Sequence, residues 1–389
     1  MPRNTHMLKL IFGVSAMAMS VFLVFSRIYF KEAGLSNGEI GVLLSIPGFI
    51  LVFSQPLWSV LTDYFGSAKR MFQIMVGGSA LFLFIYYIGA DFFLTHFLAL
   101  MVLFVAFSLF YTGRGPTRNS MTLTHLDKVG GDNRGFGGVR LWFSIGWAVC
   151  SVIVGWFFLE NSLLFLFPIS AGLFGLTALL VFLLPETERA QLQGVNIFQD
   201  PQVRKILKNR EVLIYLVALF VLGVGTLASA TFLPIYLKES FKVSTLSLGA
   251  FYAVGALAEV PFFHYGDELL AKFGIRKFII TGFTVQSLIW IVLGLVTIPA
   301  VAFLVWILRG FGWSLIYLGS VLYLDWNSPE EARTVGQGIY MTTFFGFSAI
   351  VGRLGGGFIS EWFGLGFLYL LSGALGLVGV GILIFYWLT

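Results

Sequence analysis

The stretch "TDYFGSAKRMF" (residues 62–72) joins two long apolar runs, and its residue order predicts how the chain is built. An acid, a Phe-Gly pair and two basic residues fit a tight turn between helices, because glycine allows backbone conformations that larger residues avoid. The same order returns in "GDELLAKFGIRKFI" (266–279). The two stretches follow the second and the eighth apolar run, so they predict that the chain is built from two similar halves.

The composition indicates that lipid surrounds most of this protein. The chain has 389 residues, of which 58% are hydrophobic and only 11% are charged, whereas soluble domains carry about 25% charged residues. So few charges cannot cover a water-facing surface. The 45 glycines and 43 phenylalanines suit closely packed membrane helices. The single cysteine, Cys150, excludes an intrachain disulfide.

The apolar runs predict an all-α membrane protein with twelve transmembrane helices in two six-helix bundles. A helix crosses the hydrocarbon with about 20 apolar residues, and lipid favours helices because they satisfy their own backbone polar groups. The predicted organisation is an N-terminal bundle at 1–184, a cytoplasmic linker at 185–210 and a C-terminal bundle at 211–389. The first run is interpreted as a permanent span. The predicted spans are 8–30, 38–61, 71–90, 92–113, 137–159, 163–184, 211–237, 245–266, 277–297, 300–324, 335–357 and 365–388.

The placement of lysine and arginine predicts the orientation in the membrane. Most of the 24 basic residues fall in segments on the same side as the N-terminus, Arg114 and Arg118 among them. The opposite side holds only Lys31, Lys238 and Lys242. Cytoplasmic segments carry the positive excess, so we expect a multi-pass protein of the plasma (inner) membrane with both termini in the cytoplasm. This arrangement explains the net charge of +5 without a nucleic-acid partner.

The turn at 62–72 resembles the signature loop of the major facilitator superfamily, G-x-x-x-D-x-x-G-R-x-x-R/K. Ser59 stands in place of the leading glycine and Ser67 in place of the first arginine. The resemblance implies the major facilitator fold and a cytoplasmic gating latch, while a purely structural staple of the helix ends is the alternative. The predicted latch residues are Asp63, Gly66, Lys69, Arg70, Asp267, Gly274, Arg276 and Lys277.

"FGGVRLWFSIGWAVCSVIVG" (136–155) resembles the lactose permease branch of oligosaccharide:proton symporters, which is related to phenylpropionate permeases and nucleoside:proton symporters. The resemblance implies that Arg140 binds sugar hydroxyls and that Trp147 stacks on the sugar ring. Ser144 shares their helix face by its spacing. The alternative is plain helix packing, with the arginine reaching the interface. Asn119 stands near the place of the family's fourth-helix glutamate and is a further predicted binding residue.

Ionisable residues inside the spans are few, and each is a candidate for function because charge in hydrocarbon is costly. Glu259, in "GALAEVPFF" (255–263), is the only acid deep in a span and is the predicted proton-coupling group. A carboxyl in a dry site can load and release a proton near neutral pH, but a fixed ion pair with an arginine is the alternative. Arg309 and Trp313 are predicted to bind the solute, or else to pack. Arg27 is interpreted as an interface anchor.

These observations predict a secondary active transporter that takes up a small organic solute, such as a sugar, nucleoside or aromatic acid, together with protons by alternating access. Proton-driven efflux of apolar compounds and a non-transporting membrane sensor are the alternatives. The four histidines show no metal spacing and no phosphate-binding loop is present, so we expect no metal, no cofactor and no enzymatic activity. The expected partners are a small-molecule solute, protons and the lipid bilayer, and the protein is expected to be a monomer.

Overall fold

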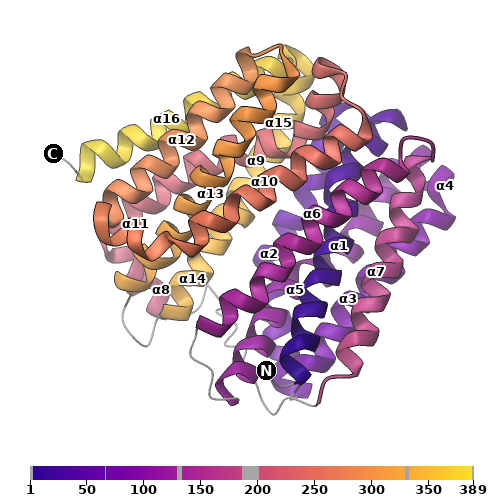
Figure 1. The fold of residues 1–389 in the computed structure, drawn as a ribbon, viewed down its shortest axis with the longest axis horizontal. Coiled ribbons are helices and arrows are strands. Elements are labelled where there is room, and N and C mark those ends of the chain that lie inside the picture. The colour runs from indigo at the N-terminus through magenta and orange to yellow at the C-terminus, as the bar shows by residue number, and fades with distance from the viewer. Residues whose placement is uncertain (1–2, 66, 129–133, 186–200, 329–332, 388–389) are drawn as a thin grey trace. The chain divides into compact units, whose positions relative to one another are not determined.

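The computed structural model describes residues 3–65, 67–128, 134–185, 201–328 and 333–387, which form helices and no strand (Figure 1). The helices of the first half are α1 (Arg3–Glu32), α2 (Asn37–Phe65), α3 (Ala68–Ile88), α4 (Ala90–Thr95), α5 (Phe97–Lys128), α6 (Arg134–Phe157), the short η1 (Leu163–Phe165) and α7 (Leu166–Phe182). Those of the second half are α8 (Pro201–Lys208), α9 (Arg210–Phe241), α10 (Thr245–His264), α11 (Gly266–Phe273), α12 (Ile275–Leu295), α13 (Pro299–Trp326), α14 (Arg333–Met341), a π-helical segment (Thr342–Ser348), α15 (Ala349–Phe363) and α16 (Leu365–Trp387).

Eleven of the described helices are long and apolar enough to cross a membrane, which confirms the all-α membrane class. The predicted span 335–357, the eleventh of the twelve, falls on three consecutive segments, because the π-helical turns at Thr342–Ser348 separate α14 from α15. A π-helix widens the turn and interrupts the α-helical hydrogen-bond pattern. No single α-helix therefore covers this run, although the chain stays helical throughout it.

Large apolar side chains lie exposed along the long helices. Ile88, Leu98 and Phe385 are 72%, 74% and 75% exposed. A protein in water rarely shows such side chains in numbers, because contiguous apolar surface drives association. Lipid chains contact these side chains without that penalty, so the exposed surface fits the low charge content of the sequence.

The chain forms two compact units, and α2 and α10 each contribute residues to both of them. The predicted division of the sequence into two bundles joined by a linker stays a prediction, and residues 186–200 of that linker lie outside the described residues. Unit 1 comprises 1–33, 50–194 and 244–253, and unit 2 comprises 34–49, 195–243 and 254–389.

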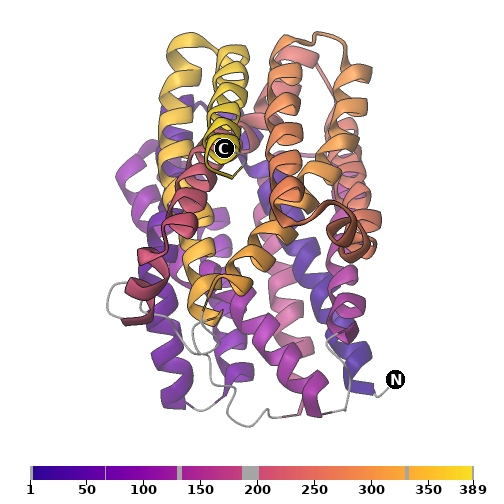
Figure 2. The same cartoon turned by 90° about the vertical axis from the view of Figure 1, so that its left-hand side faces the viewer.

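In unit 1, α1 packs against α6 and α7, and α3 packs against α5 and α7 (Figures 1 and 2). The contact between α1 and α6 is close because Gly146 faces Gly13, where an added Cβ would meet the backbone carbonyl of α1. Small residues at such contacts let two helix backbones approach and gain dispersion energy in lipid. Gly146 is one of the residues that carry the family resemblance.

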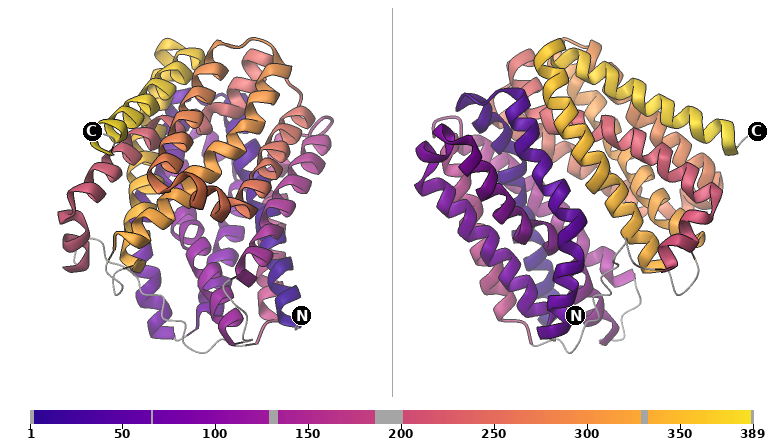
Figure 3. Two further views of the ribbon diagram at one scale, coloured as in Figure 1. Left: turned by 60° about the vertical axis from the view of Figure 1, so that its left-hand side comes forward. Right: turned by 180° about the vertical axis from the view of Figure 1, so that it is seen from behind.

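In unit 2, α16 packs against α9 and α12, while α12 also contacts α13 and α15 contacts α9 (Figure 3). The short α8 joins the same core through Val203 and Ile206, which are buried together with Val212 of α9. These contacts hold α8 beside the start of α9.

The first half of α2 is held on α15 by polar contacts within unit 2. Glu361 Oε2 accepts a hydrogen bond from the Gly38 N–H at 2.7 Å, so a carboxylate satisfies a free donor at the N-terminus of α2. Arg353 Nη1 donates to the Leu44 carbonyl at 2.9 Å. Arg353 thus binds the backbone of α2.

Candidate functional site

Glu259 of α10 and Arg309 of α13 form an ion pair within unit 2. Arg309 Nη1 lies 2.5 Å from Glu259 Oε1, and the two side chains are 25% (Arg309) and 12% (Glu259) exposed. Two glycines bring the helices close enough: a Cβ on Gly310 would meet the backbone of α10, and a Cβ on Gly255 would meet the indole of Trp306. The two predicted residues therefore meet, and the proton-coupling role of Glu259 stays a prediction.

Two indole rings flank the Arg309 guanidinium. Its Cζ atom lies 5.1 Å from the ring centroid of Trp306 and 5.5 Å from that of Trp313. Trp313 also contacts Phe344 of the π-helical segment, with ring centroids 5.6 Å apart. The guanidinium is thus flanked by two ring faces and paired with one carboxylate.

In unit 1, two arginines and a tryptophan contact the ring of Phe143 on α6. The Cζ atom of Arg140 lies 4.7 Å from the ring centroid, and that of Arg118 on α5 lies 4.8 Å from it. Trp147 stacks near the same ring, at 6.2 Å and an interplanar angle of 29°. Arg118 donates to the Ser15 hydroxyl at 3.3 Å. Arg140 makes no hydrogen bond or ion pair with any other described residue.

The other two predicted binding residues of unit 1 lie beside this group in the chain. Asn119 follows Arg118, and its Oδ1 atom is buried without a hydrogen-bond partner among the described residues. Ser144 follows Phe143 and is half-buried. A buried acceptor without a partner is costly, so Asn119 marks a place where a ligand donor would be favourable.

Three buried arginines of unit 1 depart from the sequence analysis. Arg114 and Arg118 were expected in a cytoplasmic segment, but they are 4% and 7% exposed because α5 runs on to Lys128 rather than ending at residue 113. Arg27 was expected to reach the interface and is only 8% exposed. Tyr111, Arg114 and Arg118 are spaced so that they share one face of a helix. This spacing is the signal in the sequence that could have predicted a longer helix with a buried polar face.

The predicted latch at 62–72 is partly described, and its lysine has a clear structural role. Lys69 is 7% exposed, and its Nζ donates to the carbonyls of Phe182 at 3.1 Å and Leu184 at 2.5 Å. The last carbonyls of a helix lack helical partners, and a lysine can satisfy them while complementing the helix dipole. Lys69 thus joins the start of α3 to the end of α7.

The serine that replaces the signature arginine caps α3. The Ser67 hydroxyl accepts a hydrogen bond from the Arg70 N–H at 3.2 Å, as an N-cap residue does. Arg70 itself is exposed. Gly66 and the side chain of Asp63 lie outside the described residues, so the gating role of this loop stays a prediction.

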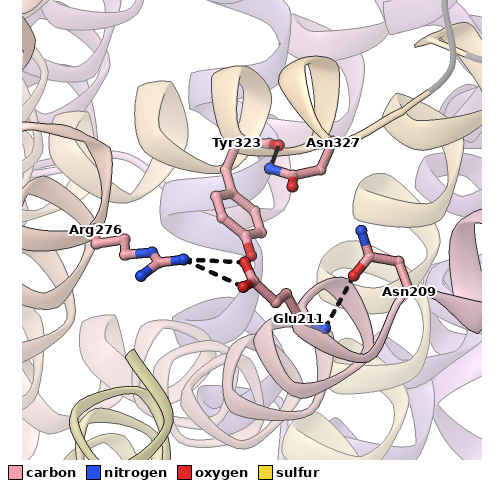
Figure 4. Close-up of polar contacts among 5 residues, drawn as sticks. All are labelled: Asn209, Glu211, Arg276, Tyr323 and Asn327. Carbon is pink, nitrogen blue, oxygen red and sulfur yellow. Dashed lines mark hydrogen bonds and ion pairs between the residues drawn. The ribbon is translucent and has the colours of Figure 1, made fainter. Parts of the chain in front are cut away.

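The second predicted latch, at 266–279, makes an ion pair with the start of α9 (Figure 4). Gly274 has φ of 72° and joins α11 to α12, a backbone conformation that favours glycine. Arg276 Nη2 lies 3.1 Å and 3.2 Å from the two carboxylate oxygens of Glu211. Glu211 lies far away in the sequence and was not predicted. Lys277 is exposed, and the side chain of Asp267 lies outside the described residues.

The start of α9 is itself capped beside this pair. Asn209 Oδ1 accepts a hydrogen bond from the Glu211 N–H at 3.0 Å, and the Tyr323 phenol points toward the Glu211 carboxylate (Figure 4). Because the Arg276 and Glu211 side chains are 46% and 42% exposed, this ion pair contributes at most about 1 kcal/mol. The gating role of this second latch stays a prediction.

Comparison with solved structures identifies the fold. The crystal structure of the nucleoside transporter NupG superposes with a TM-score of 0.85 at 18% identity, covering 98% of this chain and 98% of that chain. The fold is therefore that of the major facilitator transporters.

The chain belongs to the MFS_1 like family, whose model matches residues 6–371. The maltose permease of Geobacillus stearothermophilus is 25% identical over 376 residues, covering 96% of this chain and 90% of the permease. The putative nucleoside transporter YegT of Escherichia coli (strain K12) is 25% identical over 355 residues, covering 86% of this chain and 80% of the relative. These relatives are transporters and not enzymes, which confirms the family resemblance seen in the sequence.

Proposed function

We propose that the protein takes up a small organic solute together with protons by alternating access, as a monomer in the plasma (inner) membrane with both termini in the cytoplasm. The observation that supports this proposal most directly is the ion pair between Glu259 and Arg309. Ionisable groups inside membrane helices are costly and mark substrate or proton pathways. The transporter relatives and the family model give the coarser class to which this activity belongs.

The pair offers a simple way to link a proton to a solute. While Glu259 is ionised, its carboxylate neutralises Arg309 and holds one of its N–H donors. A proton on Glu259 weakens this hold, and the Arg309 donors then become available to a solute oxygen. Because linkage is reciprocal, a solute bound to Arg309 would in turn favour the protonated carboxyl.

The group around Phe143 provides contacts of a different kind. Arg140 keeps its hydrogen-bond donors, and Trp147 presents a large ring close to it. A guanidinium beside aromatic rings suits a solute with hydroxyl or carboxylate oxygens on a ring. In the proposal, Arg140, Ser144, Trp147 and Asn119 bind the solute, and Arg309 and Trp313 bind it in unit 2.

The test is solute-driven proton movement in proteoliposomes that contain the purified protein and a pH-sensitive dye. Maltose, uridine and 3-phenylpropionate are the probes. We expect one of them to acidify the lumen when it is added outside, and we expect Glu259→Gln to abolish that signal. The same variant should still exchange labelled for unlabelled solute, because exchange requires no net proton transfer.

Glu239→Gln is the matched control, since it makes the same chemical change at an exposed position of α9. It should retain the wild-type proton signal. Solute-driven proton flux that persists in Glu259→Gln would contradict the coupling role. A solute that moves in the wild type without any proton signal would contradict symport itself.

A further inference from the structure

Arg27 of α1 is a buried cation that the proposed mechanism does not use. It is 8% exposed and forms no hydrogen bond or ion pair with any other described residue, and its Nε atom is buried without a partner. The Ser26 hydroxyl beside it in the chain is also buried and has no partner among the described residues. A charge that is removed from water without a counter-charge is strongly unfavourable, so this position requires an explanation.

Among the described residues, the phenols of Tyr252 and Tyr111 lie close enough to Arg27 to act on it electrostatically. All three residues belong to unit 1. The Tyr111 hydroxyl is itself buried without a hydrogen-bond partner among the described residues. A guanidinium and a phenol that both have free donors form a recognition site for an oxygen anion, since both can donate to it.

A second buried guanidinium lies on the Tyr111 ring. The Arg114 Cζ atom is 3.9 Å from the Tyr111 ring centroid and 4.4 Å from that of Phe174, so two aromatic rings flank it. Its Nε atom donates to the Tyr111 carbonyl at 2.8 Å, while Nη1 is buried without a partner. Arg114 has no carboxylate partner among the described residues. Tyr111 therefore has a positively charged neighbour besides Arg27, and the surrounding potential favours an anion.

We propose that Arg27 and the Tyr111 hydroxyl bind one monoanionic group, the carboxylate of an organic solute, and that Arg114 supports its binding electrostatically. The planar fork of a guanidinium matches a carboxylate with two parallel hydrogen bonds. The inference rests on the proposed function in one respect, since it takes the occupant to be the transported solute. It narrows that solute from sugars, nucleosides and acids to carboxylates.

Binding is tested on the purified protein in detergent by its apparent melting temperature, in a chloride-free buffer. The probes are benzoate, 3-phenylpropionate, the neutral 3-phenylpropanamide and chloride. We expect a carboxylate to raise the melting temperature and its amide to have no effect. In Arg27→Gln the concentration needed for the same shift should rise about tenfold or more, because a charge-assisted hydrogen bond is lost.

A second signature separates binding from a structural role. Arg27→Gln should raise the melting temperature of the ligand-free protein, since it removes a buried charge without a partner. Tyr111→Phe removes one hydroxyl that has no partner among the described residues, so it should fold as the wild type does and show a smaller carboxylate shift. Arg204→Gln, an exposed position of α8, should show the full shift.

The proposal is overturned if no carboxylate raises the melting temperature, if Arg27→Gln and Tyr111→Phe keep the full shift, or if chloride alone produces it. A carboxylate shift that depends on Arg27, in a protein without proton flux, would support this site and overturn the coupling proposal. Proton-coupled uptake of a neutral solute that is unaffected by Arg27→Gln would support the coupling proposal and overturn the carboxylate site.

Discussion

Arg309 on α13 donates a hydrogen bond to Glu259 on α10 across 2.5 Å, and both side chains are largely buried. Each residue alone would be a costly charge in a membrane helix. Together they form a pair with no net charge, and one proton added to Glu259 would make the net charge of the pair positive. This relationship connects the stability of unit 2 with its proposed function, because a change to either side chain affects both.

Replacement of one partner should therefore be more harmful than replacement of both. Glu259→Gln leaves Arg309 charged without its carboxylate, and breaking a buried pair in this way costs about 3–5 kcal/mol. The expected result is a clear fall in the apparent melting temperature of the purified protein. The double variant Glu259→Gln with Arg309→Gln should recover most of that loss, because no charge remains unpaired. A double variant that loses the sum of the two single effects would contradict this account.

Arg140 should affect solute affinity and leave folding nearly unchanged. Its guanidinium lies over the ring of Phe143, a contact worth about 0.5–1 kcal/mol. Loss of a charged hydrogen bond to a solute costs about 1.5–3 kcal/mol, so Arg140→Gln should raise the KM for uptake roughly tenfold to a hundredfold.

Uptake kinetics and melting temperature are measured on the same Arg140→Gln preparation. Arg204→Gln serves as the control, with neither quantity changed. If Arg140→Gln kept the wild-type KM, Arg140 would be a packing residue, as the alternative interpretation of its helix face holds.

Gly146→Ala should destabilise unit 1. The added methyl group would meet the carbonyl of Gly13, a backbone atom that cannot move aside without shifting α1. Overpacking of this kind costs about 1–3 kcal/mol, which should appear as a lower melting temperature. Gly175→Ala on α7 is the matched control, because nothing lies within 4 Å of its added Cβ. Alanine favours helix over glycine by up to about 1 kcal/mol, so a loss of stability at Gly175 equal to that at Gly146 would contradict close packing as the cause.

Much of the fold follows from the sequence. Long apolar runs predict membrane helices because lipid cannot satisfy backbone polar groups, and this physical constraint acts on each segment separately. The motif stretches around 62–72 and 136–155 predict the family in the same local way. The predicted span 335–357 shows the limit, because the π-helical turns at Thr342–Ser348 left no distinct mark in the hydropathy of this run.

The candidate site could be predicted only in part. Residue type and depth within a span singled out Glu259, Arg309 and Arg140. The burial of Arg114 and Arg118 was not predicted. The hydropathy pattern placed the end of the span at residue 113, where polar residues begin, whereas α5 continues to Lys128. Polar residues on one face of a long helix lower its mean hydropathy, although packing can bury that face.

The sequence by itself determined that this chain is a helical membrane protein of a transporter family, because hydrophobic runs and short motifs are properties of neighbouring residues. Only the tertiary structure decided that Glu259 meets Arg309, that Phe143 gathers two guanidinium groups and that Arg27 is buried without a carboxylate among the described residues. These facts depend on how far apart different helices lie and how they are turned. Contacts such as those of Gly310 and Gly146 set those distances, and no local pattern in the sequence encodes them.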